Sequence, residues 1–208
     1  MYVLYGTPLS NYYNKVKLCL LEMGLPFQEQ LELPKRNWPQ GGSPSGKIPY
    51  LQCEDNTFLF ESQAIVEYLC AKHQSSLLPA DLVQAAQIRE VLFYIELYLE
   101  APMKTLYPMA YWGKPIDSEL CLSVLVQVKQ GLAVILSRVR CQPYLLNTEF
   151  SLVDVVAWVH FKTIQHALKV LGLEDIFMDT PISSYLAFCA QRPTIQRLEA
   201  DKRLAARA

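Results

Sequence analysis

The spacing of apolar residues changes near residue 80, and this change most strongly limits the folds open to the chain. Before residue 80, four short apolar runs predict strands, over residues 2–5, 27–33, 48–53 and 57–60. Two segments with helical spacing lie among them, over residues 12–23 and 62–72. The first part of the chain is therefore predicted to run βαβ, a loop rich in proline and glycine, and then ββα.

After residue 80, every remaining segment has the spacing of a helix. The expected helices cover residues 82–110, 117–140, 152–170 and 182–190, with a shorter one after Pro193. Glycine and proline mark the breaks between them, at Gly113, Pro115, Pro143, Gly172 and Pro181. We therefore predict an α/β domain over residues 1–78 and an all-helical domain over residues 84–208.

The overall charge disfavours some classes of partner. The 208 residues carry 19 basic and 20 acidic side chains, for a net charge of −1. Nucleic acids and anionic membranes attract basic surfaces, so we expect neither as a partner. The longest apolar runs are interrupted too soon for a spanning helix, and the N-terminus carries no basic leader, so we expect a cytoplasmic protein. The six cysteines contain no CxxC pair, which disfavours a zinc site, and we expect no metal.

Ser10 lies in a short loop between the first predicted strand and the first predicted helix. The start of a helix has unpaired N–H groups and a partial positive charge, so a hydroxyl placed there can donate to an anion and help to stabilise it. Serine is also a common helix cap, with its side chain turned to its own backbone. The local sequence alone leaves both interpretations open and favours the cap.

Two further motifs are suited to an amino-acid-like ligand. Pro49 opens a strand in the segment SGKIPYL, where a proline cannot donate a ladder hydrogen bond. A cis Ile48–Pro49 bond would turn the N–H and C=O of Ile48 outward to a peptide-like ligand, although a trans bond is the commoner form. Glu61 and Ser62 lie where a strand gives way to a helix, and together they suit an ammonium and a carboxylate. A solvated glutamate beside a capping serine is the alternative.

Taken together, these segments resemble the glutathione-binding half of the cytosolic glutathione transferase family. The resemblance is carried by PLSNYYNKVKLCLLEMGLPF, then SGKIPYL, then ESQAIVEYL. A fourth mark is the S-x-x-D capping box at Ser151 and Asp154, which is similar to the start of a central helix in the family's helical domain. The resemblance covers essentially the whole chain, and it implies a thioredoxin-like N-terminal domain followed by an all-α domain.

The resemblance implies a role for each matching residue. Ser10 matches the serine that hydrogen-bonds the sulfur of glutathione in serine-type classes, and Asn11 is placed to share or replace that role. The other matches would bind the tripeptide itself: Ile48 before a cis Pro49 for the cysteinyl backbone, Glu61 and Ser62 for the γ-glutamyl end, and Lys35 or Lys47 for the glycyl carboxylate.

Departures from the family pattern narrow the chemistry. Cysteine-type relatives carry a cysteine at or beside the position of Ser10, and its absence here disfavours thiol–disulfide reductase chemistry. Tyrosine-type classes use a tyrosine near the first strand, which Tyr5 offers, although the residues that follow it do not match their pattern. Ser10, Asn11 and Tyr5 therefore remain alternatives for the group that activates the thiol.

The implied activity is conjugation of the glutathione thiolate to a small hydrophobic electrophile, with glutathione as co-substrate. Aromatic or flexible apolar residues are candidates for the electrophile pocket: Leu9, Tyr12, Tyr107, Tyr111 and Trp112. The alternatives are a glutathione-dependent isomerase, dehalogenase or peroxidase on the same fold, and a non-catalytic regulatory protein. The resemblance also implies a homodimer, which the surplus of apolar residues over 82–110 supports.

Overall fold

The computed structural model describes residues 1–34 and 42–207, and the chain divides into two compact units. Unit 1 comprises Met1–Leu78 and Ala190–Ala208, and unit 2 comprises Pro79–Cys189. The order of elements follows the expectation of an α/β part and then helices alone. The predicted helical domain extended to residue 208, whereas the last segment, from Ala190 onward, belongs to unit 1.

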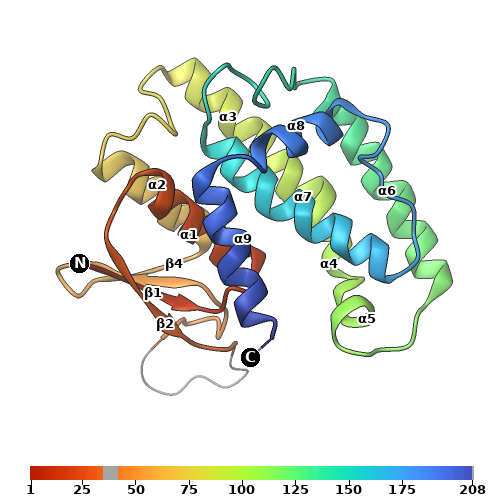
Figure 1. Ribbon diagram of the computed structural model, residues 1–208, viewed down its shortest axis with the longest axis horizontal. Coiled ribbons are helices and arrows are strands. Elements are labelled where there is room, and N and C mark those ends of the chain that lie inside the picture. The colour runs from red at the N-terminus through yellow and green to blue at the C-terminus, as the bar shows by residue number, and fades with distance from the viewer. Residues whose placement is uncertain (35–41, 208) are drawn as a thin grey trace. The chain divides into compact units, whose positions relative to one another are not determined.

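Unit 1 is built on a four-stranded mixed sheet (Figure 1). Its strands lie in the order β2-β1-β3-β4 and have the bounds β1 (Tyr2–Gly6), β2 (Phe27–Leu31), β3 (Tyr50–Gln52) and β4 (Phe58–Phe60). Helix α1 (Asn11–Glu22) joins the parallel strands β1 and β2, and helix α2 (Ser62–Lys72) follows β4. β3 is antiparallel to both β1 and β4.

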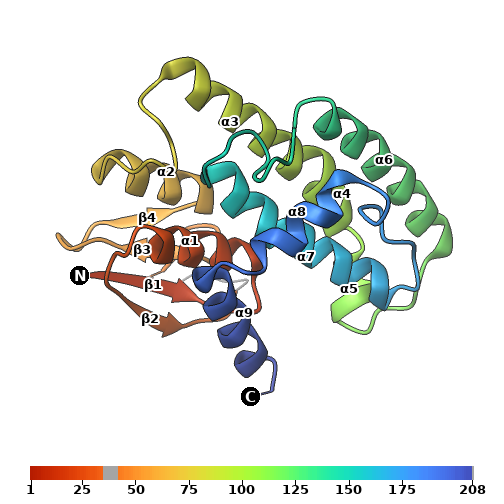
Figure 2. The same cartoon turned by 45° about the horizontal axis from the view of Figure 1, so that its top comes forward.

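The core of unit 1 lies between one face of this sheet and the two helices (Figure 2). Leu4 and Leu51 are opposite each other in the register of β1 and β3, and both are fully buried. The helices contribute further fully buried side chains, among them Val16, Leu18, Leu20, Ile65, Val66 and Leu69. β3 begins two residues later than predicted, because Pro49 has no N–H to donate to a ladder.

The last helix, α9 (Pro193–Ala205), packs along α1 within unit 1. Just before its first turn, Arg192 binds Glu22 of α1 through two hydrogen bonds, of 3.1 Å from Nε and 2.6 Å from Nη2. The Thr194 hydroxyl donates to the same carboxylate. A bidentate guanidinium–carboxylate pair fixes orientation as well as distance, so this contact holds the start of α9 against the end of α1.

Unit 2 contains helices only among its described elements. Their bounds are α3 (Leu82–Tyr94), η1 (Ile95–Glu100), α4 (Ala101–Lys104), α5 (Tyr107–Tyr111), α6 (Ser118–Leu136), α7 (Leu152–Val170) and α8 (Pro181–Cys189). The helix α7 is the most buried of them, with every residue from Leu152 to Phe161 buried. It begins with the predicted capping box of Ser151 and Asp154, which is confirmed.

The predicted single helix over residues 82–110 is interrupted in the structure. It runs as α3, then the π-helical segment η1, then α4, and after a break the short helix α5. Pro102 lacks an N–H and its ring crowds the carbonyl of Tyr98, so the helix widens just before it. Pro108 lies at the start of α5, at a position where its missing N–H costs nothing.

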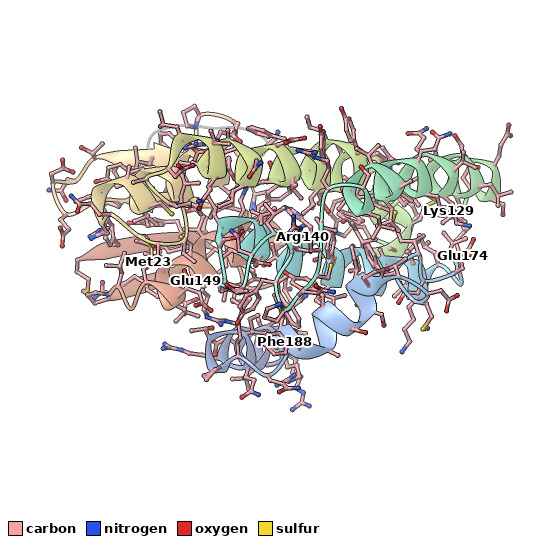
Figure 3. All side chains as sticks on the ribbon, turned by 90° about the horizontal axis from the view of Figure 1, so that it is seen from above. Met23, Lys129, Arg140, Glu149, Glu174 and Phe188 are labelled. Carbon is pink, nitrogen blue, oxygen red and sulfur yellow. The ribbon has the colours of Figure 1, made fainter. Side chains whose placement is uncertain are left out.

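Helix α6 is the one described helix that is long and apolar enough to span a membrane by length and composition alone. The expectation that apolar runs are interrupted too soon therefore fails for this segment. Its buried stripe faces the rest of unit 2, and a Cβ on Gly131 would lie 2.5 Å from the carbonyl oxygen of Tyr98. On its other side, Lys129 pairs with Glu174 at 2.5 Å (Figure 3). The helix therefore packs one stripe against unit 2, whereas Leu122, Val126 and Val134 remain exposed.

Candidate active site

The strand register brings three sequence motifs to one edge of the sheet. Tyr5, near the end of β1, pairs with Tyr50 at the start of β3, and Tyr50 pairs with Phe60 at the end of β4. The loop after β1, the residues before β3 and the residues after β4 therefore leave the sheet at the same edge. These are the segments that carry Ser10, the Ile48–Pro49 bond and Glu61.

Ser10 is the N-cap of α1, with extended backbone angles φ −88° and ψ 125°. Its Oγ accepts a hydrogen bond of 3.3 Å from the Tyr13 backbone N–H, and its own N–H donates to the Thr7 carbonyl at 3.0 Å. The side chain is half-buried, and among the described residues nothing accepts the hydrogen of its hydroxyl. The two interpretations of Ser10 are therefore compatible, because the oxygen caps the helix while the hydrogen stays available to an outside acceptor.

The other two candidates for thiol activation have different surroundings. Asn11 is the first residue of α1 and is 9% exposed, and its Oδ1 accepts from the Tyr12 N–H at 3.0 Å. Tyr5 follows the helix-facing Leu4, so its side chain projects from the opposite face of the sheet. The Tyr5 hydroxyl donates its single hydrogen to Gln52 at 3.0 Å. Within the described part of the chain, the hydroxyl hydrogen of Ser10 has no acceptor, whereas that of Tyr5 is bound to Gln52 and Asn11 carries no hydroxyl.

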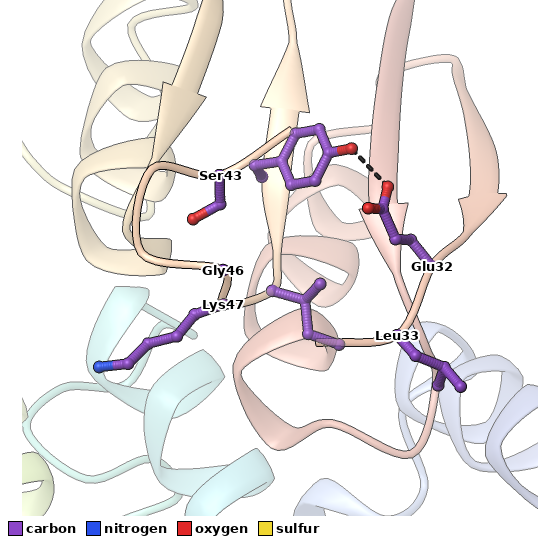
Figure 4. Close-up of a pocket in the computed structure, with 7 residues that line it drawn as sticks. Glu32, Leu33, Ser43, Gly46 and Lys47 are labelled. Carbon is purple, nitrogen blue, oxygen red and sulfur yellow. Dashed lines mark hydrogen bonds between the residues drawn. The ribbon is translucent and has the colours of Figure 1, made fainter. Parts of the chain in front are cut away.

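The Ile48–Pro49 peptide bond is cis, as predicted. Ile48 is half-buried, and neither its N–H nor its C=O has a hydrogen-bond partner among the described residues. Lys47 and Ile48 border a small hollow in unit 1, and in Figure 4 the Lys47 side chain extends outward from the loop. The hollow is also lined by Glu32, Leu33, Ser43, Gly46 and Tyr50. The remaining predicted site lysine, Lys35, lies outside the described residues.

Glu61 and Ser62 form the start of α2 in an unusual backbone geometry. Glu61 has φ 65° and ψ 113°, a positive φ that is uncommon for a residue with a side chain. Such a conformation costs about 1–3 kcal/mol and is found most often at active sites and ligand clamps. The Glu61 side chain is exposed and does not cap the helix, whereas Ser62 is buried at the first helical position. The Glu61 carboxylate is therefore accessible to a ligand at the N-terminus of α2.

A buried lysine of α1 contacts the first turn of α2, and the sequence interpretation did not identify it. Lys15 is fully buried, and its Nζ donates to Gln63 Oε1 at 3.3 Å. Gln63 in turn donates to Glu67 at 2.9 Å. Two helix N-termini and one ammonium group thus lie close together, which favours an anion at this edge of the sheet. The buried residues of α1 also include Asn11, Asn14 and Lys17, so no periodicity in the sequence marked Lys15 as buried.

The residues predicted for the electrophile pocket belong to both units. In unit 1, Leu9 is 56% exposed and Tyr12 is half-buried in the first turn of α1. In unit 2, Trp112 is 71% exposed, whereas Tyr107 is buried and donates to Glu100 at 2.6 Å.

Tyr111 of unit 2 is partly exposed, and its ring stacks on His166 at a centroid distance of 5.6 Å. Its hydroxyl donates to the Thr163 carbonyl at 3.1 Å. Burial, with a smaller contribution from Glu100, raises the pKa of Tyr111 to about 12. Tyr111 therefore stays a neutral phenol at physiological pH and presents an uncharged aromatic face.

The described residues contain no group of three or more histidine, cysteine and carboxylate side chains placed to hold a metal. All six cysteines are free thiols. A hydrogen bond with Cys70, together with burial, raises the pKa of the Cys19 thiol well above its usual value. A thiol with a raised pKa is a poor nucleophile, so Cys19 suits a structural role in the core.

Known proteins resemble this chain in sequence and in structure. The family described as glutathione S-transferase, N-terminal domain, matches residues 4–77. A glutathione S-transferase of Pseudomonas putida F1 is 34% identical to this chain over an alignment of 208 residues. The alignment covers 97% of this chain and 93% of that protein. The crystal structure of a glutathione S-transferase from Pseudomonas fluorescens Pf-5 superposes with a TM-score of 0.76 at 24% identity, covering 93% and 96% of the two chains. Poplar glutathione transferase F1 superposes with a TM-score of 0.79 at 20% identity, over 98% of both chains.

Proposed function

Because the chain belongs to the glutathione transferase family, we propose that the motifs at the sheet edge form its glutathione site, with Ser10 donating to the thiolate. The fold is the family's, and the protein is a glutathione transferase. The observation that carries the assignment to Ser10 is its hydroxyl, whose oxygen is fixed by the Tyr13 N–H and whose hydrogen has no acceptor among the described residues. In this proposal, residues 1–78 bind glutathione and residues 84–208 contribute the electrophile pocket.

The size of the required effect agrees with one hydroxyl at a helix terminus. A free cysteine thiol has a pKa of about 8.5, and lowering it by about two units needs roughly 2.7 kcal/mol of preference for the thiolate. A hydrogen bond to a charged group contributes about 1.5–3 kcal/mol, and a helix N-terminus about 0.3–1 kcal/mol. The thiol proton leaves to solvent, so no general base is needed. The thiolate then forms a C–S bond with the electrophilic carbon.

The rest of the tripeptide would be held by backbone and charged groups already at this edge. The N–H and C=O of Ile48, which have no hydrogen-bond partner among the described residues, would bond the cysteinyl backbone as an added strand does. Glu61 would accept from the γ-glutamyl ammonium, while Ser62 and the N-terminus of α2 would take its carboxylate. Lys47 would meet the glycyl carboxylate, a role in which Lys35 is the alternative.

The second substrate is proposed to be a small hydrophobic electrophile. Support comes from aromatic or apolar side chains that are at least partly exposed in each unit by itself: Leu9 and Tyr12 in unit 1, and Tyr111 and Trp112 in unit 2. Tyr107 is proposed as a wall residue with a smaller contact area, because it is nearly covered and its hydroxyl is bound to Glu100. We also retain the cytoplasmic location as a proposal.

Titration with glutathione tests the proposal and separates its alternatives. We expect calorimetric binding of glutathione and the thiolate absorbance of the bound tripeptide at neutral pH. S-methylglutathione should bind without that absorbance. Absence of binding would favour the regulatory alternative. Binding without conjugation of an aryl halide, but with reduction of an organic hydroperoxide, would favour the peroxidase alternative.

A homodimer is also part of the proposal. Large apolar side chains on α3 and η1 remain exposed in the single chain: Leu82, Val83, Phe93, Leu97 and Tyr98. Monomeric proteins seldom leave such a group uncovered, and a second copy is the simplest cover. Light scattering at micromolar concentration should give twice the 23.8 kDa of one chain, whereas a monomer mass with saturating glutathione would contradict the dimer.

A further inference from the structure

We propose that Asp201, in the C-terminal helix α9, is a positioning residue for Ser10, although the two residues lie at opposite ends of the chain. The inference rests on the proposed role of Ser10 in holding the thiolate. It follows from a continuous chain of hydrogen bonds and ion pairs inside unit 1, which connects α9 to the first turn of α1.

The chain of contacts begins at a lysine that is almost completely buried. Lys17 of α1 is 1% exposed, and its ammonium group has three donors. Two of them meet Oε1 and Oε2 of Glu29 on β2, at 2.9 and 2.8 Å. The third meets Oδ2 of Asp201 at 2.7 Å. All three donors have acceptors only when α9 supplies Asp201. A buried donor without an acceptor costs free energy of folding.

The next link runs from Glu29 to Tyr13. The Tyr13 hydroxyl donates to Glu29 Oε2, the same carboxylate that Lys17 holds. Burial and this carboxylate raise the pKa of Tyr13 above its usual value, so the hydroxyl keeps its hydrogen. The Glu29 carboxylate is therefore shared by a cation and a phenol, and its position depends on both.

The last link places Ser10. The Tyr13 ring packs against the end of β1, where a Cβ on Gly6 would lie 2.6 Å from Tyr13 Cδ2. The Tyr13 backbone N–H donates to Ser10 Oγ at 3.3 Å. Tyr13 is thus held at its ring, its hydroxyl and its backbone, and its backbone in turn orients the serine.

Removing Asp201 would loosen these contacts at their far end. Lys17 would keep only Glu29, and the pair would move toward solvent to complete the lost hydrogen bond. That movement changes the acceptor of the Tyr13 hydroxyl and loosens the turn that Tyr13 shares with Ser10. Arg192 and Thr194 hold the start of α9 through Glu22, a separate contact at the other end of α1. Loss of that contact loosens the helix without touching the links to Ser10.

The test compares Asp201→Asn with Arg192→Gln. The first readout is amide hydrogen exchange at Tyr13 in the ligand-free protein, which does not depend on glutathione. We expect about threefold faster exchange in Asp201→Asn, within the range of indirect couplings. Arg192→Gln should exchange at the wild-type rate, and Asp201→Glu should recover it. Tyr13→Phe removes only the hydroxyl link and should reproduce the faster exchange, including when Asp201→Asn does not fold.

The second readout is the thiolate fraction of bound glutathione at a fixed pH below its pKa. It should fall about threefold in Asp201→Asn and stay unchanged in Arg192→Gln. Unchanged exchange at Tyr13, or equal effects of the two substitutions, would overturn the inference. Faster exchange in a protein whose bound glutathione has the pKa of the free thiol would support the coupling and overturn only the proposed role of Ser10.

Discussion

Ser10 and Ser151 occupy the same position at the start of two helices, but their surroundings differ. Ser10 caps α1 while half-buried, and its oxygen accepts one N–H at 3.3 Å. Ser151 caps α7 while buried, and its hydroxyl donates to Asp154 Oδ2 at 2.8 Å. The hydroxyl hydrogen is therefore bound inside the protein at α7, whereas at α1 it has no acceptor among the residues that the structure describes. A capping serine can serve a ligand only where its hydrogen has no internal acceptor.

Asp154 explains why the start of α7 is closed to a ligand. The carboxylate is fully buried and accepts from the Leu145 N–H at 3.0 Å and the Ser151 N–H at 2.9 Å, in addition to the Ser151 hydroxyl. Burial raises the pKa of Asp154, while these hydrogen bonds act in the opposite direction. The group thus serves to join α7 to the segment before it, and we expect its loss to affect folding alone.

The largest expected effect tests the structural side of this comparison. Asp154→Ala leaves three buried donors without an acceptor, so we expect the free energy of unfolding to fall by about 3–5 kcal/mol. Urea unfolding measures this loss, and the exposed Asp179→Ala should change it little. Glutathione affinity of the folded fraction should not change. A stable Asp154→Ala protein with weakened glutathione binding would reverse the roles assigned to the two helix starts.

The second prediction tests the ligand side. Ser10→Ala removes the donor to the thiolate, so the pKa of bound glutathione should rise by about 1–2 units, equivalent to roughly 1.4–2.7 kcal/mol. Titration of the thiolate absorbance against pH measures it. Tyr5→Phe is the matched control, because the Tyr5 hydroxyl is bound to Gln52, and it should leave the titration unchanged. A shift in Tyr5→Phe but not in Ser10→Ala would move the role to the tyrosine.

The smallest effect belongs to Ser151. Loss of a helix cap costs about 0.5–2 kcal/mol, so Ser151→Ala should lower the thermal midpoint modestly. The thiolate titration should match that of the wild type. If Ser151→Ala raised the pKa of bound glutathione while stability stayed the same, the distinction between a structural and a functional cap would fail.

Much of the sheet edge could be predicted from local sequence. The strand–loop–helix transitions at Ser10 and Glu61, and the proline before β3, are each readable within a dozen residues. Their meeting at one edge follows from the β-strand order, which the family resemblance supplied. That Ser10 caps α1 through its oxygen alone was less predictable, because it depends on which atoms lie around one hydroxyl.

Long-range contacts were not predictable in this way. The pairs Lys15–Gln63 and Lys17–Asp201 join residues that are distant in sequence, and no periodicity links them. The place of α9 in unit 1 rests on the same kind of contact. The sequence analysis did not predict the π-helical segment η1, because the apolar spacing changes little when one residue is added to a helical turn. Pro102, just after this segment, was the only local indication of it.

The placement of α9 has a consequence for biosynthesis. Translation runs from the N-terminus, so the sheet of unit 1 leaves the ribosome well before α9, the helix that completes the unit. Until α9 is made, Lys17 has Glu29 but not Asp201, and Glu22 lacks Arg192. Unit 1 therefore lacks its last helix while all of unit 2 is being synthesised.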